Sequence, residues 1–89
     1  MTYQVRYTDG FARDLKGLDR QTARRIVKFL AERIDGTDDP RQFGQALRGA
    51  KLGELWRYRV GDWRIITNIE DDTLTVLALH TGHRRDIYK

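Results

Sequence analysis

A β-hairpin predicted at residues 55–66, with the sequence LWRYRVGDWRII, is the feature that most constrains the fold of this chain. Two runs of alternating residue type flank Gly61 and Asp62, and a two-residue loop that begins with glycine is typical of a type II′ turn, whose twist matches that of the strands. The turn fixes the register, which pairs residues across the hairpin as Val60 with Trp63, Arg59 with Arg64, Tyr58 with Ile65 and Arg57 with Ile66.

Directly opposed residues share a face of a sheet, so this register separates two kinds of side chain. One face carries Trp56, Tyr58, Val60, Trp63 and Ile65, which we expect to pack in the core rather than to stack on nucleic-acid bases. The other face carries Arg57, Arg59 and Arg64. Opposed like charges destabilise a sheet by about 0.2–1 kcal/mol. Two explanations are open for this crowding: a site for an anion such as phosphate, or a solvated face on which the side chains splay apart.

Length and composition limit the number of domains, the cellular compartment and the kinds of ligand site that are expected. With 89 residues, the chain is expected to form one domain over residues 1–89. It has no cysteine, no signal-peptide pattern and no apolar run of about 20 residues, so we expect a cytoplasmic protein. Only four of its 17 basic residues are lysine, a bias that favours phosphate recognition but that a GC-rich genome would also produce. Two histidines and no cysteine predict no metal site and no cofactor.

Before the hairpin, the sequence predicts one strand and two helices. Residues 3–8 alternate in the manner of a half-buried strand. Asp9 is the expected cap of a short helix that ends at Gly17. Asp19 is the expected cap of a second helix, whose apolar stripe comprises Ala23, Ile26, Val27, Leu30, Ala31 and Ile34. Residues 41–46 carry no pattern that decides between helix, strand and loop.

After the hairpin turn, the strand is expected to run to Glu70, with Asp71 and Asp72 turning the chain into a last strand at residues 73–81. Gly82 is expected to break that strand, so that the C-terminal tail folds back beside the arginines. The residues expected on its core face are Leu74, Val76 and Ala78. The predicted fold is α+β in the order βααβββ: an antiparallel sheet with two helices packed on one face and a short C-terminal tail.

Three local patterns follow one another along the chain: Leu47-Arg48-Gly49, the hairpin, and Gly82-His83-Arg84-Arg85-Asp86-Ile87-Tyr88. With the order of elements and the small basic domain, they resemble the RelE-type toxins of bacterial type II toxin–antitoxin pairs, in the RelE/ParE superfamily, over nearly the whole chain. The resemblance implies a metal-free endoribonuclease that cuts mRNA on the ribosome at the A site and is neutralised by a small antitoxin that wraps around it.

The resemblance also implies which residues form the site. The matching positions are Arg57 and Arg59 on one strand, Arg64 on the next, and Arg84 and Tyr88 in the tail. The sequence departs from the better-studied pattern in two ways. That pattern has lysines where Arg57 and Arg59 stand, and its tail is longer between the glycine and the tyrosine.

Metal-free RNA cleavage needs a base for the ribose 2′-hydroxyl, positive charge at the phosphorane and an acid for the leaving 5′-oxygen. The arginines supply charge but stay protonated at any working pH, so the exchange of lysine for arginine removes the obvious base. Two residues are open for proton transfer: His83, which titrates near neutral pH, and Tyr88, whose ordinary pKa of about 10 neighbouring arginines would lower. A solvated histidine and a tyrosine packed on apolar side chains are the alternatives.

Further basic residues are candidates for RNA contacts. Arg41, Arg48 and Lys51, in the stretch before the hairpin, either extend the basic surface toward ribosomal RNA or form a solvated loop, and Arg85 is a candidate in the tail. His80 is expected to face the helices and to have a structural role.

Two other functions fit the same fold: a ParE-like toxin that binds DNA gyrase and is not a nuclease, and a non-toxic partner of the antitoxin in repression of their operon. The arginine face and the tail with Arg84 and Tyr88 favour the nuclease, because a gyrase binder has no chemical need for them. The expected partners are the cognate antitoxin, the ribosome and mRNA, with operator DNA contacted only through the antitoxin complex and no contact with a membrane.

Overall fold

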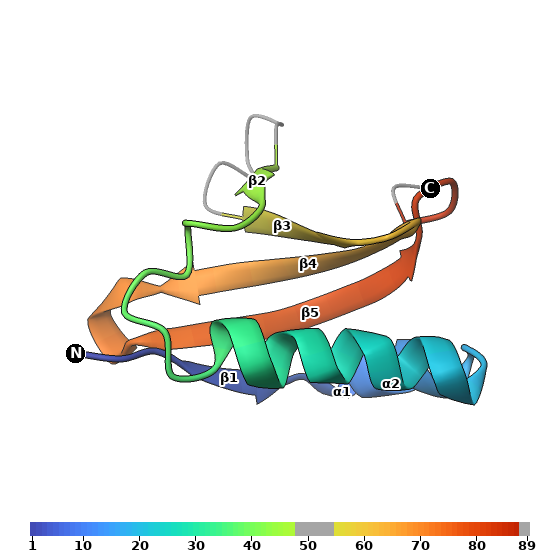
Figure 1. The fold of residues 1–89 in the computed structure, drawn as a ribbon, viewed down its shortest axis with the longest axis horizontal. Helices are drawn as coiled ribbons and strands as arrows, with labels where there is room; N and C mark the ends of the chain where they lie inside the picture. The colour runs from blue at the N-terminus through green and yellow to red at the C-terminus, as the bar shows by residue number, and fades with distance from the viewer. Residues whose placement is uncertain (48–54, 88–89) are drawn as a thin grey trace.

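The hairpin predicted from the sequence belongs to a five-stranded sheet with the strand order β1-β5-β4-β3-β2 (Figure 1). The computed structural model describes residues 1–47 and 55–87. In chain order its elements are β1 (Gln4–Tyr7), α1 (Asp9–Lys16), α2 (Arg20–Phe29), the π-helical turn η1 (Leu30–Ile34), β2 (Gln45–Ala46), β3 (Leu55–Val60), β4 (Trp63–Glu70), the 3-10 turn η3 (Asp71–Thr73) and β5 (Thr75–His83). The α+β fold is therefore confirmed, and β2 is an additional short strand.

The β3–β4 hairpin has the predicted register, with Arg59 directly opposite Arg64. Gly61 has a φ of +59°, whereas Asp62 has no positive φ, which is the pattern of a type II′ turn. The prediction succeeds because period-2 alternation and the turn residues are both local signals.

One pairing differs from the expected antiparallel sheet. β1 lies beside β5 and runs parallel to it, with Val5 opposite Val76, whereas the remaining neighbours are antiparallel. The helical segment from α1 to η1 leaves β1 and returns to it, since the backbone N of Gly36 donates to the backbone oxygen of Tyr3 at 2.8 Å, and residues 35–44 then lead to β2 at the opposite edge of the sheet. No hairpin therefore ties the direction of β1 to that of a neighbour.

The core lies between the two helices and one face of the sheet. Its buried residues are Phe11, Ile26, Leu30 and Ile34 from the helical segment and Tyr58, Ile65, Ile69, Val76 and Ala78 from the strands. Trp56, Val60 and Trp63 are partly buried and pack against it, so the apolar face of the hairpin belongs to the core as predicted. Full burial of one such side chain contributes about 1.5–3 kcal/mol relative to exposure.

The expected cap at Asp9 is wrong by one residue. Thr8 caps α1: its hydroxyl accepts a hydrogen bond from the backbone N of Phe11 at 3.1 Å and donates to the backbone of β5 at 2.8 Å. The second bond joins the start of the helix to the sheet, a tertiary contact that local sequence does not reveal. Asp19 caps α2 as predicted, since its carboxylate accepts from the backbone N of Thr22 at 3.1 Å. Hydrogen bonding from the side chain and then from the backbone of Thr22 lowers the pKa of Asp19.

The apolar stripe of α2 and η1 is narrower than predicted. The row that faces the sheet is completely buried and comprises Ile26, Leu30 and Ile34. Val27 and Ala31 are exposed, because each lies about 100° around the helix from the buried row. α1 ends with Gly17 as its C-cap, as expected. Within the described residues, no helix is long and apolar enough to cross a membrane.

β5 begins and ends two residues later than predicted. The turn η3 precedes it, and Leu74, expected on its core face, instead lies before the strand in a left-handed conformation with φ +50°. The expected break at Gly82 is wrong, because the strand continues through Gly82 to His83. A Cβ atom at Gly82 would lie 3.3 Å from Cδ1 of Ile87, so the glycine makes room for the tail rather than ending the strand.

We predict that Tyr58→Phe lowers the free energy of unfolding by about 1–3 kcal/mol at pH 7. The Tyr58 side chain is completely buried, and its hydroxyl donates to the backbone oxygen of Pro40 at 2.7 Å, so phenylalanine leaves a buried carbonyl without this donor. Burial raises the pKa of Tyr58. Its contribution to stability is therefore present below the unfolded pKa of about 10 and falls as the pH rises above that value.

Chemical denaturation at pH 7 and pH 11 measures both effects. The difference between wild type and Tyr58→Phe should shrink at pH 11, because the variant has no hydroxyl to ionise at this position. Tyr7→Phe is the matched control, since the Tyr7 side chain is 48% exposed. A loss of stability in Tyr58→Phe no larger than in Tyr7→Phe would show that the bond to Pro40 contributes little.

Candidate functional site

The three hairpin arginines line one pocket on the face of the sheet that the helices leave open. Its volume is about 280 Å³, and its lining residues are Gly44, Gln45, Arg57, Arg59 and Arg64. We call it the arginine pocket. Arg57 and Arg64 are partly buried and Arg59 is exposed. Among the described residues, none that lines the pocket is a carboxylate, so this lining is cationic and suited to an anion.

Neutral oxygen atoms hold two of these arginines. Nη2 of Arg57 donates to Oε1 of Gln45 at 2.6 Å. Nη1 of Arg64 donates to the backbone oxygens of Gly61 and Trp63 at 2.9 and 3.0 Å. A neutral acceptor orients a guanidinium without adding a negative charge of its own.

The C-terminal tail meets the hairpin at the β3–β4 turn (Figure 1). The backbone N of Arg84 donates to the backbone oxygen of Asp62 at 2.8 Å, and Nε of Arg84 lies 3.8 Å from Oδ1 of Asp62. Ile87 packs on Gly82, which stands opposite Arg64 in the β4–β5 pairing. The tail therefore folds back onto the arginine face, with the Arg84 side chain beside Asp62 in the β3–β4 turn.

His83 lies on the other face of the sheet. It stands opposite Trp63, and the two rings meet edge to face with centroids 5.3 Å apart. Its Nδ1 accepts a hydrogen bond from the backbone N of Arg85 at 3.2 Å. Because Gly82 faces Arg64, alternation directs the next residue toward the helices, and so the structure does not bring the His83 ring together with the arginines.

Other candidates divide into those that the structure describes and those that it does not. Arg85 is exposed in the turn after β5. Arg48, Lys51 and Tyr88 lie outside the described residues. Nδ1 of His80 lies 3.0 Å from a carboxylate oxygen of α1, in the side chain of Asp14, which is consistent with the expected structural role.

Two lining residues of the pocket escaped the sequence prediction, namely Gly44 and Gln45. Gly44 has a φ of +79°, and a Cβ atom there would clash with the backbone oxygen of Arg57. Gln45 pairs with Arg57 in the β2–β3 ladder. A two-residue strand is too short to show alternation, and the only local signal was the glycine itself, which often marks a close approach of two backbones.

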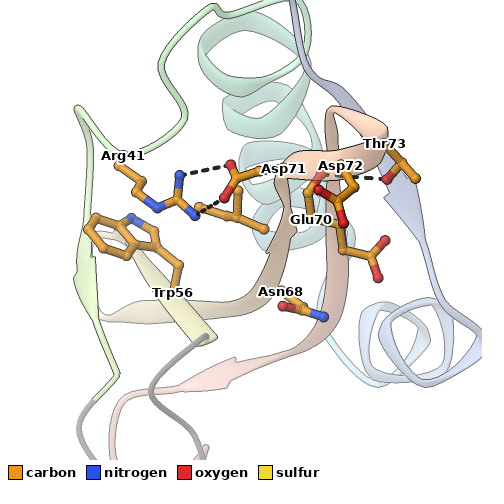
Figure 2. Close-up of a pocket in the computed structure, with 8 residues that line it drawn as sticks. Arg41, Trp56, Asn68, Glu70, Asp71, Asp72 and Thr73 are labelled. Atoms are coloured by element: carbon orange, nitrogen blue, oxygen red, sulfur yellow. Dashed lines mark hydrogen bonds and ion pairs between the residues drawn. The ribbon is translucent and has the colours of Figure 1, made fainter.

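A second pocket of about 560 Å³ lies at the end of β4 and has a different character; its lining residues are Arg41, Trp56, Asn68, Ile69, Glu70, Asp71, Asp72 and Thr73. Figure 2 shows the Arg41 guanidinium facing the Asp71 carboxylate beside the Trp56 ring, and both N–O distances of this pair are 3.0 Å. The Tyr3 hydroxyl also donates to Asp71 at 2.6 Å. The bonds from Arg41 and then from Tyr3 lower the pKa of Asp71.

This second pocket is larger than the arginine pocket but is the poorer candidate for an RNA site. Its three carboxylates repel phosphate, and Arg41, for which the sequence leaves both an RNA-facing surface and a solvated loop open, is paired with Asp71. The pair and Tyr3 join the start of β1 to the β4–β5 turn. Within residues 1–47 and 55–87, no group of three or more histidine, aspartate or glutamate side chains is placed to hold a metal ion.

Comparison with known proteins gives the family. A sequence profile described as "ParE toxin of type II toxin-antitoxin system, parDE" matches residues 5–88. The chain is 34% identical over its full 89 residues to Toxin RelG of Mycobacterium tuberculosis and covers 99% of that protein.

Solved structures agree with the profile. A chain of the toxin–antitoxin complex RelBE2 from Mycobacterium tuberculosis is 30% identical, with a TM-score of 0.83 and coverage of 94% of this chain and 100% of that one. A chain of the archaeal RelE–RelB complex from Pyrococcus horikoshii is 25% identical, with a TM-score of 0.67 and coverage of 97% and 99%. The chain therefore belongs to the RelE/ParE family and is a toxin of a type II toxin–antitoxin system.

Proposed function

We propose that this toxin is a ribosome-dependent endoribonuclease that cleaves mRNA at the A site without a metal ion. The observation that carries the proposal is the arginine pocket, in which three guanidinium groups from β3 and β4 line a space whose described lining residues include no carboxylate. Repulsion among the three guanidinium groups lowers the stability of the fold. Stabilisation of an anionic transition state is a function that explains their presence.

In the proposed reaction, the ribose 2′-oxygen attacks the adjacent phosphorus, a phosphorane forms, and the bond to the 5′-oxygen breaks. Arg57, Arg59 and Arg64 stabilise the negative charge that develops on the non-bridging oxygens. Arg84, which lies beside the β3–β4 turn, contacts the same phosphate or its neighbour.

We assign proton transfer to a residue of the C-terminal tail. The His83 ring packs against Trp63 on the helix-covered face, so we assign it the role of holding the tail through its bond from the backbone of Arg85. Tyr88 is the proposed proton-transfer group, because it follows Ile87 directly in the chain and Ile87 packs on Gly82, the residue that stands opposite Arg64. Arg48, Lys51 and Arg85 are proposed to contact RNA outside the scissile phosphate.

The proposed protein partner is a cognate antitoxin, as in the RelE–RelB and RelBE2 complexes of the relatives. The exposed outer side of α2 offers a suitable surface, where apolar Ala23 and Val27 lie beside the basic residues Arg20, Arg24 and Lys28. An amphipathic antitoxin helix with an acidic flank complements this surface in both shape and charge. The ribosome and mRNA are the proposed targets, and operator DNA is contacted through the antitoxin complex.

The proposal is tested by mapping mRNA 5′-ends in cells after pulsed production of the wild-type chain and of a variant with Arg64→Ala and Arg84→Ala. We expect discrete cuts at A-site codons that require translating ribosomes and that vanish in the variant. The matched control carries Arg13→Ala and Arg33→Ala, which remove the same charge from exposed positions on α1 and η1; it should cut like the wild type.

The other outcomes have distinct meanings. Intact mRNA with arrested growth would contradict the nuclease and point to a target such as gyrase. Intact mRNA without growth arrest would leave only a role as the partner of the antitoxin.

A further inference from the structure

We propose that Gln45 is a positioning residue of the arginine pocket: its amide oxygen orients the Arg57 guanidinium toward a bound phosphate group without cancelling the charge of that guanidinium. The inference rests on the proposed function, since it assigns the pocket an anionic substrate. It adds a residue that neither the sequence patterns nor the resemblance to the family identified.

The position of Gln45 is fixed by contacts on the core side of β3. The Tyr58 hydroxyl donates to the backbone oxygen of Pro40 at 2.7 Å, and the indole Nε1 of Trp56 donates to the backbone oxygen of Phe43 at 2.6 Å. These two bonds hold residues 40–43 against β3. Gln45 follows two residues later, on the open face of the sheet.

Gly44 makes the crossing between the two faces possible. Its φ of +79° and the absence of a Cβ atom allow the backbone to lie directly against that of Arg57. β2 then pairs with β3, with Gln45 opposite Arg57. The backbone pairing of β2 with β3 therefore places the Gln45 side chain opposite Arg57, independently of the hydrogen bond between the two side chains.

Only one atom of the Gln45 amide can accept the hydrogen bond from the Arg57 guanidinium. A guanidinium has donors and no acceptor, so the group of Gln45 that lies 2.6 Å from Nη2 of Arg57 is the amide oxygen. The oxygen is neutral. A glutamate in its place would accept the same hydrogen bond, but it would add a negative charge to the pocket wall and compete with phosphate for Arg57.

Glutamine, alanine and glutamate at position 45 are therefore expected to rank differently in stability and in phosphate affinity. If Gln45 serves only to pair β2 with β3, stability should follow the strength of the contact with Arg57, with glutamate at least as good as glutamine and alanine worst. Phosphate affinity should then stay unchanged in Gln45→Ala and fall only in Gln45→Glu, whose charge repels phosphate. If Gln45 positions Arg57 for an anion, phosphate affinity should instead fall from glutamine to alanine to glutamate.

The experiment is a titration of the folded ¹⁵N-labelled protein with inorganic phosphate, followed through the Nε–Hε signal of Arg57 in the NMR spectrum. Relative to the wild type, we expect Gln45→Ala to weaken the affinity about threefold through loss of one neutral hydrogen bond. We expect Gln45→Glu to weaken it about tenfold or more through the added charge. Gln42→Glu is the matched control, because Gln42 is exposed three residues earlier and does not line the pocket; it should bind phosphate within twofold of the wild type, roughly the weakening that one exposed charge produces.

The results separate this inference from the proposed function. A phosphate affinity of Gln45→Ala equal to that of the wild type overturns the role of Gln45, even if mapping of mRNA ends shows cleavage. A wild-type protein whose Arg57 signal does not respond to phosphate also overturns it. The predicted order in a protein that leaves mRNA intact supports the positioning role of Gln45 and contradicts only the nuclease.

Discussion

Arg57→Ala is expected to slow the cleavage of ribosome-bound mRNA by about 100- to 1,000-fold, the loss that follows removal of one preorganised donor to a developing oxyanion. The Arg57 guanidinium lines the arginine pocket and is held there by Gln45. It is partly buried, so its interaction with a phosphorane is screened less than that of a surface charge. The measurement is single-turnover cleavage on programmed ribosomes at saturating toxin, which isolates the chemical step from binding.

Two comparisons show whether the loss comes from the site. Arg33→Ala removes an exposed arginine from η1 and should cleave at the wild-type rate. Arg57→Lys keeps the charge but loses the planar fork of donors, and we expect an intermediate rate. A cleavage rate for Arg57→Ala within threefold of that for Arg33→Ala would show that Arg57 does not stabilise the transition state.

The sequence predicted the arginine face because the signals are local. Alternation along β3 and β4 and the Gly61–Asp62 turn fix which residues oppose one another, and the observed register follows residue by residue. Three arginines on one face of a hairpin must then lie near each other, whatever surrounds them. The same reasoning placed the aromatic residues of the opposite face in the core.

The parts that escaped prediction depend on contacts between distant segments. Thr8 rather than Asp9 caps α1 because its hydroxyl also bonds to β5, 70 residues away. β5 continues through Gly82 because the space of the missing side chain is filled by Ile87. That continuation, in turn, decides that His83 faces Trp63 instead of the arginines.

The loop before β2 is the clearest case. Residues 40–46 have no periodic pattern, yet Pro40 and Phe43 accept hydrogen bonds from side chains of β3, and Gln45 completes the pocket. The donors are Tyr58 and Trp56, residues of the apolar hairpin face that the sequence assigned only to packing. Residues of β3 thus have two roles. Its arginines line the pocket on the open face of the sheet, and its aromatic side chains on the core face hold the loop that leads to Gln45.

Gly44→Ala should therefore damage both stability and function. We expect the free energy of unfolding to fall by about 2–5 kcal/mol, from the strain of a left-handed conformation and from steric overlap. A Cβ atom at Gly44 would clash with the backbone oxygen of Arg57 and lie 2.8 Å from Nε1 of Trp56 and 3.0 Å from Cδ1 of Tyr58. None of these is the free end of a flexible side chain, so the loop itself has to move away from β3.

Gly36→Ala separates the two causes. Gly36 has a φ of +85°, but a Cβ atom there would meet nothing within 4 Å, so this variant carries the backbone strain alone and should lose about 1–2 kcal/mol. Denaturant unfolding of both variants gives the difference due to contact with β3. Equal losses would show that the approach of Gly44 to β3 is not required. A larger loss in Gly44→Ala, with weaker phosphate binding by the protein that remains folded, would show that this crossing of the chain holds Gln45 and the Arg57 guanidinium in place.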